Sequence, residues 1–140
     1  MNGLITITDT HNADGHIEKS EMQTVAQTSG AENDYYIVYN EQSEEMQGCK
    51  TTVHVTDGKC VHITRTGSYN TELKMEKGRR NLCCYTTPVG QINMGIYTSR
   101  VISEFSEKTI MLDFTYTLDC NNELISRNRV KIKVEYKEAD

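Results

Sequence analysis

Arg65 and Glu41 are the charged residues whose positions point most directly to chemistry. Arg65 has the same parity as Ile63 along an alternating apolar and polar stretch, and Glu41 has the same parity as Tyr39. Both charges are therefore expected to face the apolar side of the fold. A charge that faces a core is costly when it is alone and tolerable when it is paired. We expect Arg65 to have a carboxylate partner near one end of the core, and Glu41 is the best candidate.

Two interpretations of this pair stay open at the level of sequence. The pair could simply close one end of the core, or Arg65 could anchor a carboxylate or phosphate of a ligand through its bidentate fork. Tyrosines would give such a site apolar walls with hydroxyl groups at the edge. The residues expected to line one polar end of the site are Tyr39, Glu41, Arg65, Tyr85 and Thr87.

The stretch His54–Gly67 is compatible with two hairpin registers. A two-residue turn at Asp57-Gly58 would mix apolar and polar residues on each face. A three-residue loop at Thr56-Asp57-Gly58, built as a type I turn with Gly58 as a left-handed bulge, places Val53 opposite Val61 and every apolar residue on one side. Because a one-residue slip moves the whole apolar set of a strand, the second register is predicted.

That register also gathers potential metal ligands on the outward face. His54 lies directly opposite Cys60 in it, and His62 lies two residues further on. Soft ligands of this kind can hold zinc or copper. However, a fourth ligand is missing and no C-x-x-C or H-x-x-x-H spacing occurs, so we interpret the patch as a solvated strand face. No metal site and no cofactor are expected.

The elements that position these residues are strands. The segments "TIMLDFTYTL" (109–118) and "RVKIKVEY" (129–136) alternate apolar and polar residues with a period of two, and β-branched and aromatic residues dominate them. Turn signals such as Asp14-Gly15 and Asn121-Asn122 separate the runs at short spacing. The pattern predicts one all-β domain over residues 1–140, with about eight to ten antiparallel strands in a sandwich or a closed barrel.

Composition excludes several classes of protein. The chain has 140 residues, a net charge of −5 and an isoelectric point near 5.4, and its basic residues form only interrupted clusters. A nucleic-acid partner is therefore not expected. No segment approaches the roughly 20 apolar residues of a membrane-spanning helix, and no signal peptide is evident. The five cysteines are odd in number and form no disulfide framework, so a cytoplasmic protein is predicted.

The usual catalytic motifs are missing. The sequence has no G-x-S-x-G, no phosphate-binding loop and no zinc-hydrolase motif. Glu41 with Tyr85 or Arg65 could perform acid–base chemistry only if the geometry allows it. His11 and His16 flank a turn and are expected to be solvated. An enzyme is accordingly the least favoured of the functional classes.

Six segments of the chain resemble, in order, the YwiB-like family of small bacterial proteins of unknown function. The segments are "YYIVYNEQ", "TTVHVTDGKCVHITRTG", "LKMEKGRRNLCCYTTPVG", "MGIYTSRV", "LDFTYTLD" and "LISRNRVKIKVEY". The motif positions are Tyr39-Asn40-Glu41, Arg65-Thr66-Gly67, Tyr85 to Gly90, and Asn128 of the last strand. The resemblance implies a closed antiparallel barrel of the calycin or lipocalin type, and it implies no activity.

The functional expectation follows from the barrel. A barrel of this size either encloses one small ligand or is filled by its own side chains. We expect a small apolar, amphipathic or anionic ligand inside the barrel or at its mouth. The alternatives are a filled barrel that acts as an interaction module, for example as a homodimer, and an enzyme that uses Glu41, Arg65 and Tyr85. No outward apolar stripe in the sequence favours the homodimer.

Overall fold

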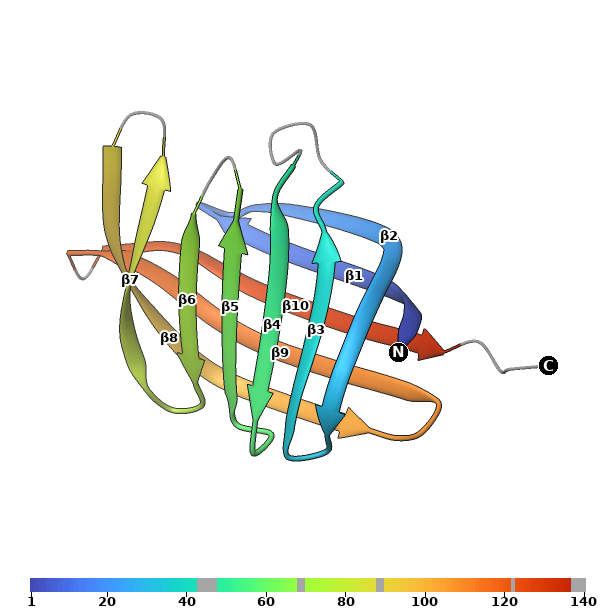
Figure 1. The fold of residues 1–140 in the computed structure, drawn as a ribbon. Coiled ribbons are helices and arrows are strands. Elements are labelled where there is room, and N and C mark those ends of the chain that lie inside the picture. Colours follow the sequence, from blue (N-terminus) through green and yellow to red (C-terminus); the bar gives the residue numbers. More distant parts are fainter. Residues whose placement is uncertain (43–47, 68–69, 88–89, 122, 137–140) are drawn as a thin grey trace.

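The computed structural model is a closed β-barrel (Figure 1), and it describes residues 1–42, 48–67, 70–87, 90–121 and 123–136, without the side chains of residues 85–87. Within these ranges the strands are β1 (Asn2–Ala13), β2 (His16–Ala31), β3 (Asp34–Asn40), β4 (Lys50–Thr56), β5 (Cys60–Thr66), β6 (Thr71–Glu76), β7 (Arg80–Thr87), β8 (Gly90–Phe105), β9 (Thr109–Cys120) and β10 (Glu123–Tyr136). Each strand is antiparallel to its neighbours, in the order β1-β10-β9-β8-β7-β6-β5-β4-β3-β2. The prediction of a closed all-β barrel is confirmed.

The barrel is flattened into two layers that cross at a steep angle. Strands β3 to β7 stand upright in front, and β1, β10, β9 and β8 run across behind them (Figure 1). The long strand β2 belongs to both layers, because its first part runs beside β1 and its last part runs beside β3. No helix that is long and apolar enough to cross a membrane occurs in the described part of the chain.

The period-two pattern explains which side chains fill the interior. In β3, β4 and β5 the alternate residues Tyr35, Ile37, Val53, Val55 and Val61 are completely buried. Their neighbours along each strand point outward and are polar or only half-buried. The largest buried side chains of the back layer are Ile5, Ile96, Ile110, Leu112, Phe114 and Val134. The core is therefore a single interior that all ten described strands enclose.

The β4–β5 hairpin corrects part of the predicted register. Val53 lies opposite Ile63 and Val55 lies opposite Val61, so the three loop residues are Asp57 to Lys59. The predicted pairing of Val53 with Val61 is wrong by two positions, although the predicted inward and outward faces are right. Asp57 and Gly58 have φ angles of 54° and 63°, so both are left-handed and the turn is not type I.

The exposure of inward-facing side chains changes along the strands of the barrel. Ile5 on β1 is fully buried, whereas Ile7, further along the same strand, is only half-buried. The same gradient runs along β5, where Val61 is buried and Ile63 is half-buried. Inward-facing apolar side chains that are half-buried include Met22, Met94, Tyr116, Leu118 and Val130. We call the part of the interior that these residues border the open end.

The pairing of β2 explains why one end is open. Residues 16–27 of β2 pair with β1, but β3 pairs only with residues 26–31. Among the described residues, the first half of β2 therefore pairs with a strand on one side only. At the opposite end, polar pairs help to close the interior: Tyr35 Oη lies 2.6 Å from Ser103 Oγ.

The seam between β2 and β3 generates a prediction about closure. Gly30 lies opposite Tyr35 with φ near 105°, and a Cβ atom added there would lie 2.3 Å from the carbonyl oxygen of Asp34. Gly15 also has a positive φ of about 80°, but an added Cβ would meet nothing within 4 Å. We predict that Gly30→Ala destabilises the protein by at least about 1 kcal/mol more than Gly15→Ala, as measured by urea unfolding. Equal losses in the two variants would show that the seam tolerates the extra atom.

Candidate functional site

Arg65, Glu41 and Thr51 form a connected polar group at the ends of three neighbouring strands. Arg65 Nε lies 3.3 Å from Glu41 Oε1, which confirms the predicted ion pair. The Thr51 hydroxyl donates a hydrogen bond of 2.6 Å to the same Glu41 oxygen and accepts one of 3.3 Å from Arg65 Nε. The Arg65 and Glu41 side chains are 20% and 10% exposed, so the pair is mostly buried and still borders solvent.

The register places these residues in one row on the inner face. Tyr39 lies directly opposite Thr51, and Thr51 lies directly opposite Arg65. Burial of Tyr39 raises the pKa of its phenol, the Glu41 carboxylate raises that pKa further, and Arg65 opposes the shift. Tyr39 is consequently a neutral hydroxyl beside an ion pair, which suits it to hydrogen bonding and not to proton transfer.

Two of the predicted site residues can be placed only by their backbone. Tyr85 pairs with Thr71, which pairs with Arg65, so the backbone of Tyr85 continues the same row onto β7. Thr87 pairs with Gly90 near the end of β7. The side chains of Tyr85 and Thr87 lie outside the described residues, so their part in the site stays a prediction.

A second polar group, which the sequence interpretation missed, lies inside the back layer. His11 Nδ1 lies 2.6 Å from Asn128 Oδ1, and Asn128 Nδ2 donates a 3.0 Å hydrogen bond to Ser126 Oγ. Ser126 and Asn128 are 1% and 4% exposed. Because the Asn128 oxygen can only accept, His11 carries its proton on Nδ1 and its Nε2 is an acceptor in the neutral ring. The expectation that His11 is solvated is wrong.

Asp9 is the neighbour of His11 on the same face of β1. Its carboxyl group is half-buried, and burial raises its pKa while His11 lowers it. The alternation of Ile5, Ile7, Asp9 and His11 along the sequence already indicates that Asp9 and His11 share the inward face with the two isoleucines. It was overlooked because His11 is only a few residues from the Asp14-Gly15 turn, although β1 continues to Ala13.

The outward residues His54, Cys60 and His62 are arranged differently from the prediction. His54 lies opposite His62, and Cys60 lies opposite Thr56, so the predicted pairing of His54 with Cys60 is wrong. His54 Nε2 lies 2.6 Å from Asp34 Oδ1, and His62 Nε2 lies 2.8 Å from Glu72 Oε1. No group of three or more metal-ligating side chains occurs in the parts of the chain that the structure describes.

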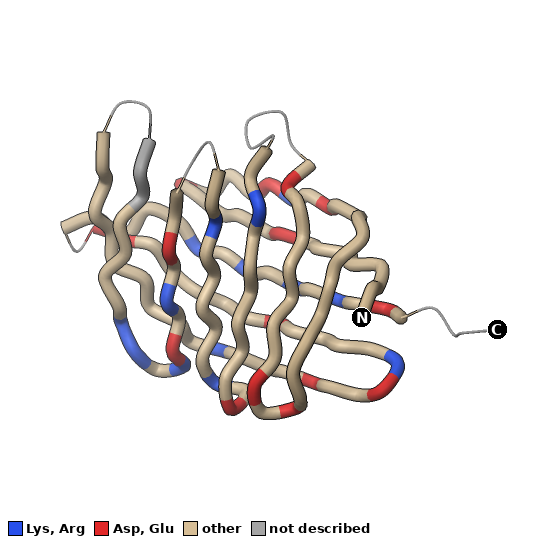
Figure 2. Tube along the Cα trace, in the orientation of Figure 1, with Lys and Arg blue, Asp and Glu red and all other residues tan. Residues whose placement is uncertain are grey.

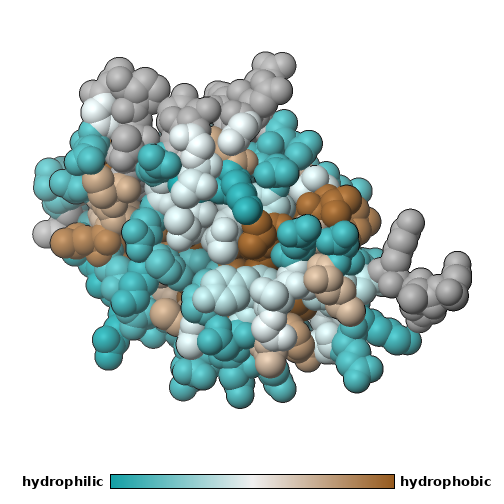
Figure 3. All heavy atoms as spheres, viewed as in Figure 1, coloured by the Kyte–Doolittle hydropathy of each residue, from teal (hydrophilic) through white to brown (hydrophobic). Residues whose placement is uncertain are grey.

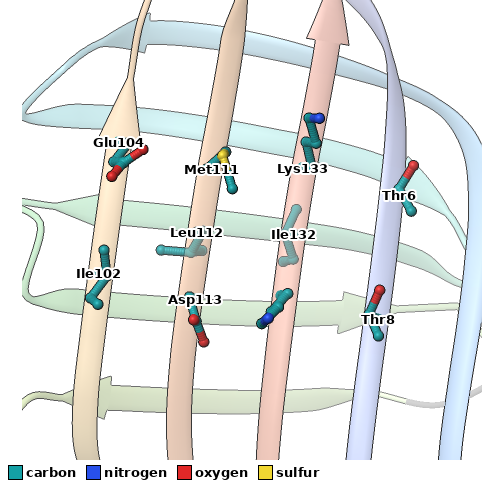
Figure 4. A pocket seen from close by; sticks show the side chains of 10 residues that line it. Thr6, Thr8, Ile102, Glu104, Met111, Leu112, Asp113, Ile132 and Lys133 are labelled. Carbon is teal, nitrogen blue, oxygen red and sulfur yellow. The ribbon is translucent and has the colours of Figure 1, made fainter.

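The outer surface of the back layer carries a groove of about 350 Å³ (Figure 4). Its lining residues come from β1, β8, β9 and β10, and the labelled ones include Met111, Ile102, Glu104, Asp113 and Lys133. Apolar and charged side chains alternate there, with Met111 46% exposed. Most of its lining side chains have the outward parity, and Leu112 and Ile132, which face the core, form its floor, so the groove lies on the outer face and not at the open end.

The charges elsewhere do not form a surface of one sign. Figure 2 shows lysines and arginines interleaved with aspartates and glutamates along the strands and turns. On the front face, polar side chains predominate and apolar ones show as separate groups (Figure 3). The visible surface therefore offers neither a basic stripe for nucleic acid nor a continuous apolar stripe.

Comparison with known proteins agrees with this fold. Residues 5–132 match the family described as "Domain of unknown function (DUF1934)". The crystal structure of the ywiB protein from Bacillus subtilis superposes with a TM-score of 0.85 at 19% sequence identity, covering 98% of this chain and 92% of that one. No curated protein matches the chain. The likeness to the ywiB structure therefore establishes the barrel and leaves its function to be argued from the site.

The Glu41–Arg65 pair generates the second prediction. In a double-mutant cycle of Glu41→Gln and Arg65→Met, we predict a coupling free energy of about 1 to 3 kcal/mol by urea unfolding, because either single change leaves a mostly buried charge without its partner. The control is the cycle of Asp113→Asn and Arg129→Met, a pair on the outer face. A smaller coupling is expected there because solvent screens it. Additive effects of Glu41→Gln and Arg65→Met would contradict the interpretation.

Proposed function

This chain belongs to the DUF1934 family, and we propose that it is a binding protein that holds one small amphipathic molecule at the open end of its barrel. The observation that carries the proposal is the exposure of inward-facing apolar side chains. Ile7, Ile63 and Leu118 point into the barrel and are only half-buried. Apolar surface that faces an interior and still meets water gains free energy when an apolar group covers it.

In this proposal, the group of Arg65, Glu41 and Thr51 recognises the polar part of the ligand at the edge of the open end, which we call the rim. Both described contacts of Arg65 with Glu41 and Thr51 are made by Nε. The terminal nitrogens of the guanidinium are donors by chemistry, and in this proposal they bind the polar part of the ligand. The neutral hydroxyl of Tyr39 adds a second polar contact, and Tyr85 and Thr87 would extend the rim along the same row.

This arrangement favours binding over catalysis. The Arg65 cation is neutralised by Glu41, and burial keeps Tyr39 protonated, so the described rim presents no activated base or nucleophile. A few polar groups beside an apolar wall are the usual composition of a small-molecule site. We also propose a cytoplasmic location, which is supported by the free state of all five cysteines.

Self-association through the outer groove is a second candidate. Met111 and Ile102 are 46% and 40% exposed there, and charges of both signs surround them. A surface that carries both signs can complement a second copy of itself. The outer face is independent of the open end, so the two candidates are compatible with each other.

Native mass spectrometry tests both candidates in one measurement. We predict that the protein, incubated with a metabolite and lipid extract, retains a reproducible small-molecule adduct, and that Arg65→Met reduces its occupancy at least several-fold. The control is Arg129→Met, which removes an arginine from the outer face and should leave the adduct unchanged. Thermal unfolding confirms that both variants are folded.

The absence of an adduct across several extracts would contradict the binding proposal. An adduct that Arg65→Met leaves intact would remove Arg65 from the site. The same spectra report the mass of the assembly, and a dimer that persists without any adduct would favour the outer groove as the functional surface.

A further inference from the structure

The first half of β2 carries a sheet edge that no described strand covers, and we propose that a second copy of this chain pairs with it. Residues 16–25 pair with β1 on one side, whereas β3 pairs only with residues 26–31. Figure 1 shows this part of β2 along the upper border of the back layer. We call residues 16–25 the free edge. The assembly is a two-fold dimer in which one sheet continues from the first barrel into the second.

The backbone of the free edge supplies the main attraction. Alternate residues of an edge strand point their N–H and C=O groups away from the sheet, and these groups can pair with another strand. No backbone hydrogen bond joins residues 16–25 to a described residue outside β1. An added antiparallel strand would form about one backbone hydrogen bond for each pair of opposed residues. The free edge is therefore suited to recognition by strand addition.

The charges on the outward face of the free edge identify the partner as a second copy. When two copies pair antiparallel about a two-fold axis at Ser20, Lys19 of each copy lies directly opposite Glu21 of the other. An axis at Lys19 would instead place two lysines opposite each other, and an axis at Glu21 would oppose two glutamates. Charged residues on an edge usually prevent pairing between copies. Here the order of the two signs makes the edge complementary to itself.

Lys19 and Glu21 are available for such a partner. Both are exposed, their neighbours on β1 are threonines, and neither forms an ion pair with a described residue. The same spacing of lysine and glutamate occurs on β6, where Lys74 Nζ lies 3.3 Å from Glu76 Oε1 of the same strand. The pair on β6 is satisfied within one chain, whereas the charges of the free edge can be satisfied by the opposed strand of a second chain.

The apolar side chains of the free edge gain cover in the same register. Ile17 and Val25 point outward and are both exposed. With the axis at Ser20, Ile17 lies opposite the alkyl stem of Gln23 of the second copy and diagonal to its Val25. Diagonal neighbours across an antiparallel pair are about 7 to 8 Å apart, so these side chains shield part of each other's surface. The two-fold axis repeats this contact at the other end of the paired segment.

The free edge is a different surface from the outer groove. The groove is lined by residues of β1, β8, β9 and β10, and none of its lining residues belongs to β2. A contact through the groove would stack two sheets face to face, whereas the free edge extends a single sheet. The dimer is also independent of the proposed binding function, because it requires neither Arg65 nor a bound small molecule.

An exchange of charges tests the dimer and its register together. Sedimentation velocity over a concentration series gives the dissociation constant of the dimer. We expect Lys19→Glu and Glu21→Lys each to raise this constant at least ten-fold, because each change places like charges opposite each other twice. The variant that combines both changes restores opposite signs across the axis, and we expect its dissociation constant to return close to that of the unmodified protein.

The control is Lys131→Glu, which makes the same change of charge in the outer groove and should leave the dimer intact. Thermal unfolding confirms that each variant is folded. A protein that stays monomeric at every concentration overturns the proposal. So does a dimer that survives Lys19→Glu and Glu21→Lys, or one that the combined variant does not restore. Loss of the dimer in Lys131→Glu alone would overturn it as well and would assign self-association to the outer groove.

Discussion

Closure of the sheet is the constraint on which the other features of this protein depend. Because β1 pairs with β10 on one side and with β2 on the other, the strand order returns to its start. A closed sheet gives every strand an inner and an outer face, and it removes the free edges that would otherwise pair with other chains. The alternation of apolar and polar residues then decides burial, residue by residue. The inward position of Arg65 and of Asp9 is a consequence of that alternation.

The same closure is incomplete at one place, and this gives the interior its two different ends. Strand β2 shares only residues 26–31 with β3, so its first half covers the interior from one side. Away from the open end, apolar packing and pairs such as Tyr35 with Ser103 satisfy the inward groups. Toward the open end, the inward positions change to polar and charged residues. The Arg65–Glu41 group and the His11–Asn128 group come from different layers of the barrel and both face this end.

The sequence alone predicted which face of each strand points inward, but it did not predict which residues of neighbouring strands lie opposite each other. The ion pair between Glu41 and Arg65 followed from parity alone, because a buried face tolerates a charge only beside its opposite. The β4–β5 hairpin shows the limit. A shift of two residues leaves every side chain on the same face, so the apolar pattern cannot distinguish Val53 opposite Val61 from Val53 opposite Ile63. Likewise, the prediction that the sheet closes into a barrel came from the resemblance to a family of known barrels, because the apolar pattern is equally compatible with a sandwich.

Contacts between distant strands were the hardest to foresee. His11 and Asn128 are separated by 117 positions in the chain, and only the pairing of β1 with β10 brings them together. Nearness to the Asp14-Gly15 turn made a solvated His11 the natural expectation. The strands in fact continue up to that turn, so the residues beside it still alternate between the two faces. Long hairpins of this kind carry inward residues almost to their tips.

The central claim is that water reaches the inner face at the open end of the barrel and does not reach the fully buried inward side chains. Methyl NMR of isoleucine-labelled protein in the presence of a small neutral nitroxide tests it most directly. The account predicts strong broadening of the Ile7 and Ile63 methyl signals, which are half-buried, and little broadening of Ile5, Ile37 and Ile110, which are fully buried. Equal protection of all five signals would contradict the account, because it would show an interior filled from end to end.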